Sequence, residues 1–229
     1  MAVRATLAAS IGAVVIVAGT ASGAMSFLTQ ARSVTASTTF DGQTDTKAAP
    51  DFNPFVQTAS VATFFPSVTG TSINRAVAGI DCHLDPNKIK VVGSLAAAGG
   101  LSLVNGEQAE EIGDAVALVS LSFHIDADSP FVLAASARPS SNPKDKFKIK
   151  LAGPGGGNVV FFMDEKDPAQ SVQFAGVLGA GDYTLEYEAE LSSGGPDTQS
   201  EYAFTLDIPA PSVAALLGVC GLGLLRRRR

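Results

Sequence analysis

Apolar and polar residues alternate with a period of two along most of the chain between residues 25 and 208. The alternation is clearest in 117–125, where apolar residues occupy one face and Ser120, Ser122 and His124 occupy the other. The predicted strands are 33–40, 55–65, 72–80, 89–97, 117–125, 131–137, 146–151, 158–163, 183–191 and 202–208. Alternation of this kind, broken by Gly, Pro, Asn and Asp turns, is typical of half-buried antiparallel strands. The pattern therefore predicts an all-β fold, an antiparallel, jelly-roll-like β-sandwich.

Four segments depart from this rule. Residues 158–163 are nearly all apolar, which predicts a strand buried on both faces. Residues 108–113 form the only candidate for a short helix. Residues 43–54 and 81–87 are rich in turn-forming residues and are predicted to be loops.

Two strands carry rows of opposite charge on their polar faces. The first row is Lys146, Lys148 and Lys150, and the second is Glu186, Glu188 and Glu190. If the two strands are neighbours, the rows form a cross-strand ladder in which each exposed pair contributes about 0.2–1 kcal/mol. The alternative is two independently solvated faces.

The N-terminus is typical of an export signal. Arg4 supplies a positive start, residues 7–18 are mostly apolar, and the small residues 20–24 follow them directly. This order predicts a signal helix, 1–24, which signal peptidase removes after Ala24. An uncleaved anchor helix is the alternative.

The C-terminal residues 208–229 combine three features in a fixed order: Pro209-Ala210-Pro211, a chargeless apolar run 212–225, and Arg226, Arg227, Arg228 and Arg229. Fourteen residues span only about 21 Å, against a hydrocarbon core of about 30 Å. Starting the span at Ile208 and letting the arginine stems snorkel would extend it. The alternative, a buried core helix with a basic cap, would normally show a polar face, which this run lacks. We therefore expect a transmembrane helix whose arginines stay cytoplasmic.

This tail resembles a PEP-CTERM sorting signal, although Ala210 replaces the glutamate of the family's Pro-Glu-Pro motif. The resemblance implies recognition by an exosortase, a membrane-embedded transpeptidase-like enzyme of bacteria with an outer membrane. It also implies a role alongside exopolysaccharide or biofilm material. The precursor would be tethered in the inner membrane, and the mature protein would reach the cell surface or the extracellular space.

These patterns divide the chain into three parts: the signal peptide 1–24, a β-sandwich domain 25–207 and the sorting tail 208–229. The β-sandwich domain is acidic. Without Arg4 and the four tail arginines, 11 of the 16 basic residues remain against 22 acidic ones. An acidic body repels nucleic acid, so DNA or RNA binding is not expected. A body of this size suffices for one core.

Candidate chemistry is sparse. Asp126 and Asp128 could hold calcium, but a plain acidic turn is the favoured interpretation because the glycine and glutamate of an EF-hand loop are missing. Cys82 is expected to be a lone buried thiol, since Cys220 lies in the apolar tail. Asp81, Cys82 and His83 are adjacent in sequence and should not converge. No cofactor or metal is predicted.

These features are compatible with three functions. The preferred one is a non-enzymatic structural protein of the cell surface or matrix. The second is a secreted carbohydrate- or calcium-binding module, which would need exposed aromatic residues on one sheet face; without tryptophan, only Tyr and Phe could serve. The third, a secreted hydrolase, lacks a convergent triad or carboxylate pair.

Overall fold

The computed structural model describes residues 24–67, 70–104, 107–138, 140, 145–164 and 170–209. Apart from one short 3-10 turn, Pro154–Gly156, the regular elements there are strands. The strands are β1 (Met25–Thr38), β2 (Thr44–Ala48), β3 (Phe55–Ser67), β4 (Gly70–Asp85), β5 (Lys88–Ala98), β6 (Gly100–Val104), β7 (Glu107–Glu111), β8 (Gly113–Ile125), β9 (Ser129–Arg138), β10 (Lys146–Ala152), β11 (Asn158–Asp164), β12 (Gln170–Leu178), β13 (Gly181–Ser193) and β14 (Thr198–Asp207). The predicted signal helix and transmembrane helix lie outside the described residues. Among the residues that are described, no helix is both long and apolar enough to cross a membrane.

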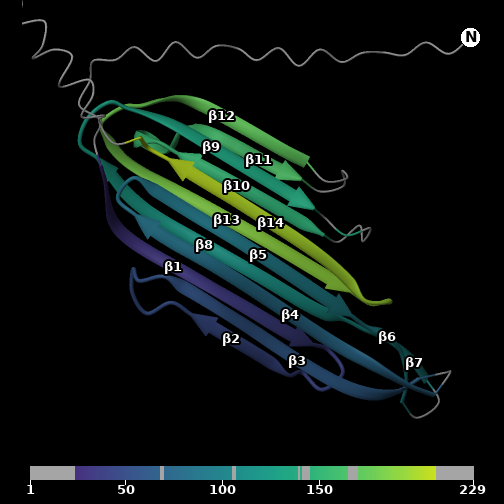
Figure 1. Ribbon diagram of the computed structural model, residues 1–229. Helices are drawn as coiled ribbons and strands as arrows, with labels where there is room; N and C mark the ends of the chain where they lie inside the picture. Colours follow the sequence, from purple (N-terminus) through teal and green to yellow (C-terminus); the bar gives the residue numbers. More distant parts are fainter. Residues whose placement is uncertain are drawn as a thin grey trace, which may run out of the picture. The chain divides into compact units, whose positions relative to one another are not determined.

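The strands form two antiparallel sheets (Figure 1). Sheet A has the order β11-β10-β13-β8-β1-β2, and sheet B has the order β12-β9-β14-β5-β4-β3-β6-β7. Of the strands β5 and β8–β14, four lie in sheet B in the order β5-β14-β9-β12, and four lie in sheet A in the order β8-β13-β10-β11. Between β8 and β14 the chain crosses from one sheet to the other at every connection except the β10–β11 hairpin. This arrangement has the connectivity of two Greek keys and is consistent with the predicted jelly-roll-like sandwich. The predicted all-β, antiparallel fold is confirmed.

Side chains from the two sheets share one hydrophobic core. The ring of Phe147 in β10 stacks on Tyr202 in β14 with centroids 4.8 Å apart. The ring of Tyr187 in β13 lies 5.4 Å from that of Phe204 in β14. Both pairs join sheet A to sheet B, and aromatic contacts of this kind add about 0.5–1.5 kcal/mol beyond the area that they bury.

The charge ladder between β10 and β13 is confirmed. The register sets Lys146 opposite Glu190, Lys148 opposite Glu188 and Lys150 opposite Glu186. Lys146 Nζ lies 3.2 Å from Glu190 Oε2, and Lys148 Nζ lies 3.5 Å from Glu186 Oε2 and 3.7 Å from Glu188 Oε2. Glu186 and Glu188, two carboxylates on one strand face, are therefore partners of lysines on an open sheet face.

Two predicted elements are wrong. Residues 108–113 contain no helix, because β7 pairs with β6 from Gly100↔Glu111 to Val104↔Glu107 and this hairpin overrides the local helix propensity. The prediction that 158–163 is a strand buried on both faces is wrong, since Val159 is 41% exposed in the edge strand β11 of sheet A.

Two predicted loops contain strand residues. The first holds β2, which pairs with β1. In the second, β4 continues to Asp85, so that the turn shrinks to Pro86 and Asn87. The strand β12 was not predicted at all.

Candidate functional site

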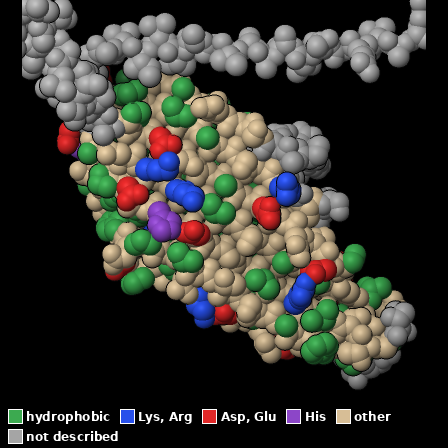
Figure 2. Space-filling view, in the orientation of Figure 1, with side chains coloured by type: hydrophobic (Ala, Val, Ile, Leu, Met, Phe, Trp, Pro, Cys, Tyr) green, Lys and Arg blue, Asp and Glu red, His purple; other side chains and the backbone are tan. Residues whose placement is uncertain are grey.

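The outer face of sheet B carries paired charges (Figure 2). His83 Nε2 lies 2.7 Å from Asp81 Oδ1, and Lys88 Nζ lies 2.9 Å from Asp207 Oδ1. Acidic and basic side chains stand beside one another on this face, as Figure 2 shows. The face therefore offers local ion pairs rather than an extended field of one sign.

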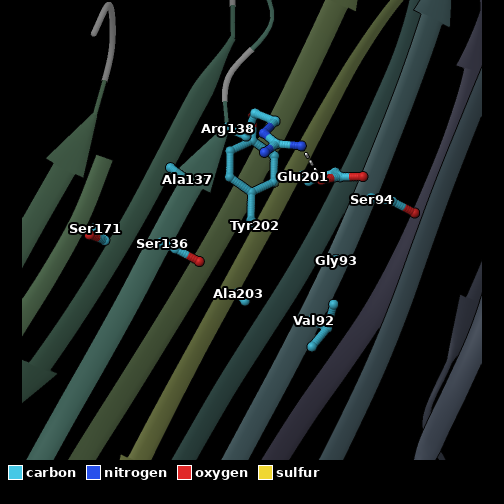
Figure 3. A pocket seen from close by; sticks show the side chains of 10 residues that line it. All are labelled: Val92, Gly93, Ser94, Ser136, Ala137, Arg138, Ser171, Glu201, Tyr202 and Ala203. Atoms are coloured by element: carbon cyan, nitrogen blue, oxygen red, sulfur yellow. Dashed lines mark hydrogen bonds and ion pairs between the residues drawn. The ribbon is translucent and has the colours of Figure 1, made fainter. Parts of the chain in front are cut away.

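A shallow hollow of about 530 Å³ lies over the middle strands of this face (Figure 3). Its floor consists of small residues that lie side by side on three strands. Ser136 in β9 is opposite Ala203 in β14, and Ala203 is opposite Val92 in β5. The Arg138–Glu201 ion pair, 3.5 Å from Nη1 to Oε2, borders it. Small side chains and one exposed ion pair provide no strong anchor for a ligand.

A second hollow of about 590 Å³, called here the Phe64 hollow, lies at one end of sheet B. Its lining comes from β3, β4 and the segments before β6 and β14: Phe64, Ile73, Arg75, Gly99, Pro196 and Asp197. Phe64 is 71% exposed. Arg75 Nη2 pairs with Asp197 Oδ2. An exposed aromatic ring beside a planar polar pair can recognise a ligand with both an apolar face and hydroxyl groups.

A buried carboxylate lies beneath the first hollow. Asp145, 3% exposed, accepts hydrogen bonds from the hydroxyls of Tyr202 and Ser200 and from the backbone N–H of Ser140. Burial, followed by the hydrogen bond to Asp145, raises the pKa of Tyr202 well above its ordinary value. The carboxylate is enclosed by its donors, which indicates a structural role in joining the β9–β10 connection to β14.

Arg32 is a buried cation without a carboxylate partner in the described part of the chain. It is 2% exposed, and its guanidinium donates to the backbone oxygens of Asp51 and Asn53 and, through Nε, to Gln30. Its guanidinium carbon also lies 5.7 Å from the centre of the Phe55 ring. Burial raises the pKa of the neighbouring Cys82 thiol, although the hydrogen bond from Arg32 opposes that shift. Arg32 thus fixes the loop after β2, and Cys82 is a free, buried thiol as predicted.

The side chains of the calcium candidates Asp126 and Asp128 interact with different parts of the chain. Asp126 Oδ1 lies 3.3 Å from His124 Nε2, whereas Asp128 Oδ1 accepts from the backbone N–H of Ala180 at 3.3 Å. His124 Nδ1 also lies 2.6 Å from Asp182 Oδ1. In the described residues, no three His, Cys, Asp or Glu side chains are placed to hold a metal ion. The alternating geometry of β4 likewise separates buried Cys82 from the exposed His83–Asp81 pair.

Both ends of the described body meet the same turn. Met25 N donates to Pro86 O at 2.7 Å, and Ile208 N donates to Asn87 O at 2.8 Å. Ile208, counted in the tail by the sequence pattern, is fully buried in the core and therefore belongs to the body. Ala24 and Pro209 are exposed directly outside it. Ala210, Pro211 and Arg226 to Arg229 lie outside the described residues.

Sequence reasoning missed the Phe64 hollow. Arg75 and Asp197 are 122 residues apart in the chain, and only the sheet order brings them together. The single signal in the sequence was Phe64 itself, which adjoins Phe65 in β3, so that one ring must face outward while the other is buried.

No family model matches the chain, and no curated protein matches its sequence. Among solved structures, the C-terminal CBM6 of LamC, a marine laminarinase from Zobellia galactanivorans, is 10% identical, with 66% of this chain and 99% of that chain covered and a TM-score of 0.23. The N-terminal cellulose-binding domain of Cellulomonas fimi β-1,4-glucanase C is 12% identical, covering 66% of this chain and 89% of that chain, with a TM-score of 0.27. The enzymatically active domain of bacteriophage CBA120 tailspike protein 4 is 9% identical at a TM-score of 0.25, and the match covers 77% of this chain but only 19% of the tailspike chain. Likenesses this small identify neither a ligand nor an activity.

Proposed function

We propose that this chain is an exported, non-enzymatic structural protein of the cell surface or extracellular matrix. Signal peptidase would cleave after Ala24, and the tail that begins at Pro209 would tether the precursor in the inner membrane. The arginines Arg226 to Arg229 would remain cytoplasmic. An exosortase-like transpeptidase would then act at Pro209, Ala210 and Pro211, and the mature body would join exopolysaccharide material.

The observation that carries this proposal is the meeting of both ends of the described body at one turn. Because Met25 and Ile208 bond adjacent carbonyl oxygens of the Pro86-Asn87 turn, the first and last strands of the described body begin and end at the same turn. A membrane holding either flanking segment, or both, therefore needs no rearrangement of the sandwich. Burial of Ile208 and exposure of Pro209 would place the processing motif at the first position accessible to an enzyme.

Replacing Pro209 and Pro211 together by alanine should block tail removal. The wild-type protein, recovered from the producing cells, should end near residues 209–211, whereas the variant should retain Arg229 and stay in the membrane fraction. Mass spectrometry of the C-terminus measures this outcome, and deletion of the sorting enzyme should reproduce it. The neighbouring change Ser212→Ala is the control. Surface-exposed wild-type protein with an intact Arg229 would refute the proposal.

The Phe64 hollow favours a second candidate function, the binding of a neutral polysaccharide. The apolar face of a sugar ring would pack on Phe64, and its hydroxyls would bond the Arg75–Asp197 pair. All three tyrosines are buried, so Phe64 is the exposed aromatic residue that this interpretation requires on sheet B.

Phe64→Ala should weaken polysaccharide binding by roughly tenfold or more, since stacking on an aromatic ring contributes about 0.5–1.5 kcal/mol beyond buried area. A glycan array identifies the ligand, and titration calorimetry then compares the variants. Phe52→Ala is the matched control, because Phe52 is also exposed, at 39%, but packs on Phe27 away from this hollow. Equal affinities of wild type and Phe64→Ala, or an array without binding, would reject this function.

A further inference from the structure

The unpaired edges of the two sheets differ in their protection. An edge strand offers free backbone N–H and C=O groups to another strand, and proteins normally block it with charges, proline or a cover. In the described part of the chain the strand order ends at β2 and β11 in sheet A, and at β7 and β12 in sheet B. The outer edge of β3 is also largely free, because β3 pairs with β6 only at Ser67↔Ser102. Charged residues or prolines in these strands determine whether each edge is blocked.

The edges at β2 and β7 carry charges. β2 contains the Asp45–Lys47 ion pair, 2.7 Å from Oδ1 to Nζ, and β7 contains three glutamates in five residues. Asp45 also protects the neighbouring strand β3, whose Ser60 N–H donates to Asp45 Oδ2 at 3.0 Å. A strand approaching this side would have to displace or desolvate these carboxylates.

The edge strands β11 and β12 lie on the opposite side of the sandwich (Figure 1), and β12 lacks such protection. The nine residues of β12, QSVQFAGVL, contain neither a charged residue nor a proline. Val177 on its outer face is 66% exposed. On its inner face, Val172 and Phe174 pack against the core but remain only partly buried, because the sheet ends there.

We propose that β12 pairs antiparallel with β12 of a second copy of this chain, so that sheet B continues across a two-fold axis. A two-fold axis brings the same strand against itself in the antiparallel sense and makes one patch serve both partners. Pairing would satisfy the free backbone groups and complete the burial of Val172 and Phe174 in both copies.

Charge favours this partner. The chain is acidic overall, with 22 acidic residues against 16 basic ones, so two copies repel each other over most faces. The strand β12 is a neutral edge on an acidic protein, where two copies can approach without burying a carboxylate of the strand itself. A basic partner would gain nothing from a strand without charge. The inference goes beyond the proposed function, since it concerns the β body whether or not the tail is processed.

The test uses the protein purified from the producing cells and compares hydrogen exchange over a range of protein concentrations. Self-pairing predicts that amides in residues 170–178 become more protected as concentration rises, while those in 107–111, on the charged edge, do not. Sedimentation should show a monomer–dimer equilibrium over the same range. Residues 170–178 whose exchange is independent of concentration would overturn the proposal, as would protection that requires a different protein.

A charge on the edge provides the matched variant. Ala175→Lys places like charges near each other across the two-fold axis and should weaken dimerisation about fivefold or more. The control is Ala62→Lys, at another exposed alanine, on β3. Equal dissociation constants for the two variants would overturn the proposal. If Ala175→Lys does not fold, the exchange measurement on the wild type still decides.

Discussion

Gly113→Ala should lower the free energy of unfolding by about 3 kcal/mol or more, which is a large part of the stability of an ordinary domain. A β-carbon at Gly113 would lie 2.1 Å from the backbone oxygen of Arg75 and 2.7 Å from that of Ala98. Gly113 begins β8 in sheet A, whereas Arg75 and Ala98 belong to β4 and β5 in sheet B. The two sheets therefore touch backbone to backbone here, and neither oxygen can move away without breaking its strand.

Urea unfolding followed by circular dichroism measures this effect. Gly157→Ala is the matched control, because a β-carbon there would meet nothing within 4 Å and its φ of −68° suits alanine. The control should unfold close to the wild-type midpoint. A Gly113→Ala protein that also unfolds there would show that the sheets do not approach so closely at this end.

The strands with strict alternation could be predicted because the period of two directly reports one buried and one exposed face. In β8, β9, β10 and β13 the buried residues are the apolar ones that the pattern placed inward. The charge ladder was a correct hypothesis about strand pairing, since opposite rows of three charges are favourable only between neighbours. Alternation alone, however, does not specify sheet order.

The edges were the part that sequence could not predict. An apolar run is consistent with a central strand, but β11 ends sheet A because of the order in which the strands cross between sheets. The glutamate-rich β7 looked helical, since its residues favour a helix and its pairing with β6 is visible only in the folded chain. β12 mixes glutamine, serine and glycine with apolar residues, and this composition gives no clear strand signal.

The candidate sites also differ in whether their residues are contiguous in the chain or are brought together by the fold. Motifs contiguous in the chain, such as Pro209-Ala210-Pro211, could be recognised from sequence alone. The Phe64 hollow could not, because its polar pair comes from β4 and from the segment before β14. The meeting of Met25 and Ile208 at one turn likewise depends on backbone hydrogen bonds to Pro86 and Asn87, which are far from both residues in sequence.

Alkaline unfolding should coincide with ionisation of the tyrosines. All three tyrosines are buried, and burial raises the pKa of Tyr183, Tyr187 and Tyr202. Nearby groups add to the shift, namely Asp128 beside Tyr183, Cys82 beside Tyr187, and the hydrogen bond from Tyr202 to Asp145. The native protein should therefore show no phenolate absorbance near pH 10, where an unfolded tyrosine titrates.

The sign of the effect follows from the direction of these shifts. Each phenol whose folded pKa is raised above its unfolded value contributes stability that is complete below about pH 10 and is lost as pH rises toward the folded value. Tyr187 and Tyr202, the two most strongly shifted, together give a slope of about 2.7 kcal/mol per pH unit, because each proton contributes about 1.4 kcal/mol. A free energy of unfolding of about 5–15 kcal/mol would therefore fall to zero within a few pH units above pH 10.

Absorbance of phenolate and circular dichroism, recorded together during an alkaline titration, test this expectation. Both signals should change in one cooperative transition above pH 10, and the protein unfolded in urea should instead titrate near pH 10. Tyr187→Phe provides the control, since it keeps the ring beside Phe204 but removes one proton from the linkage and should reduce the slope by about half. Phenolate formation in a protein that keeps its native circular dichroism would mean that the tyrosine rings are open to solvent. That result would contradict the burial of these rings between the two sheets.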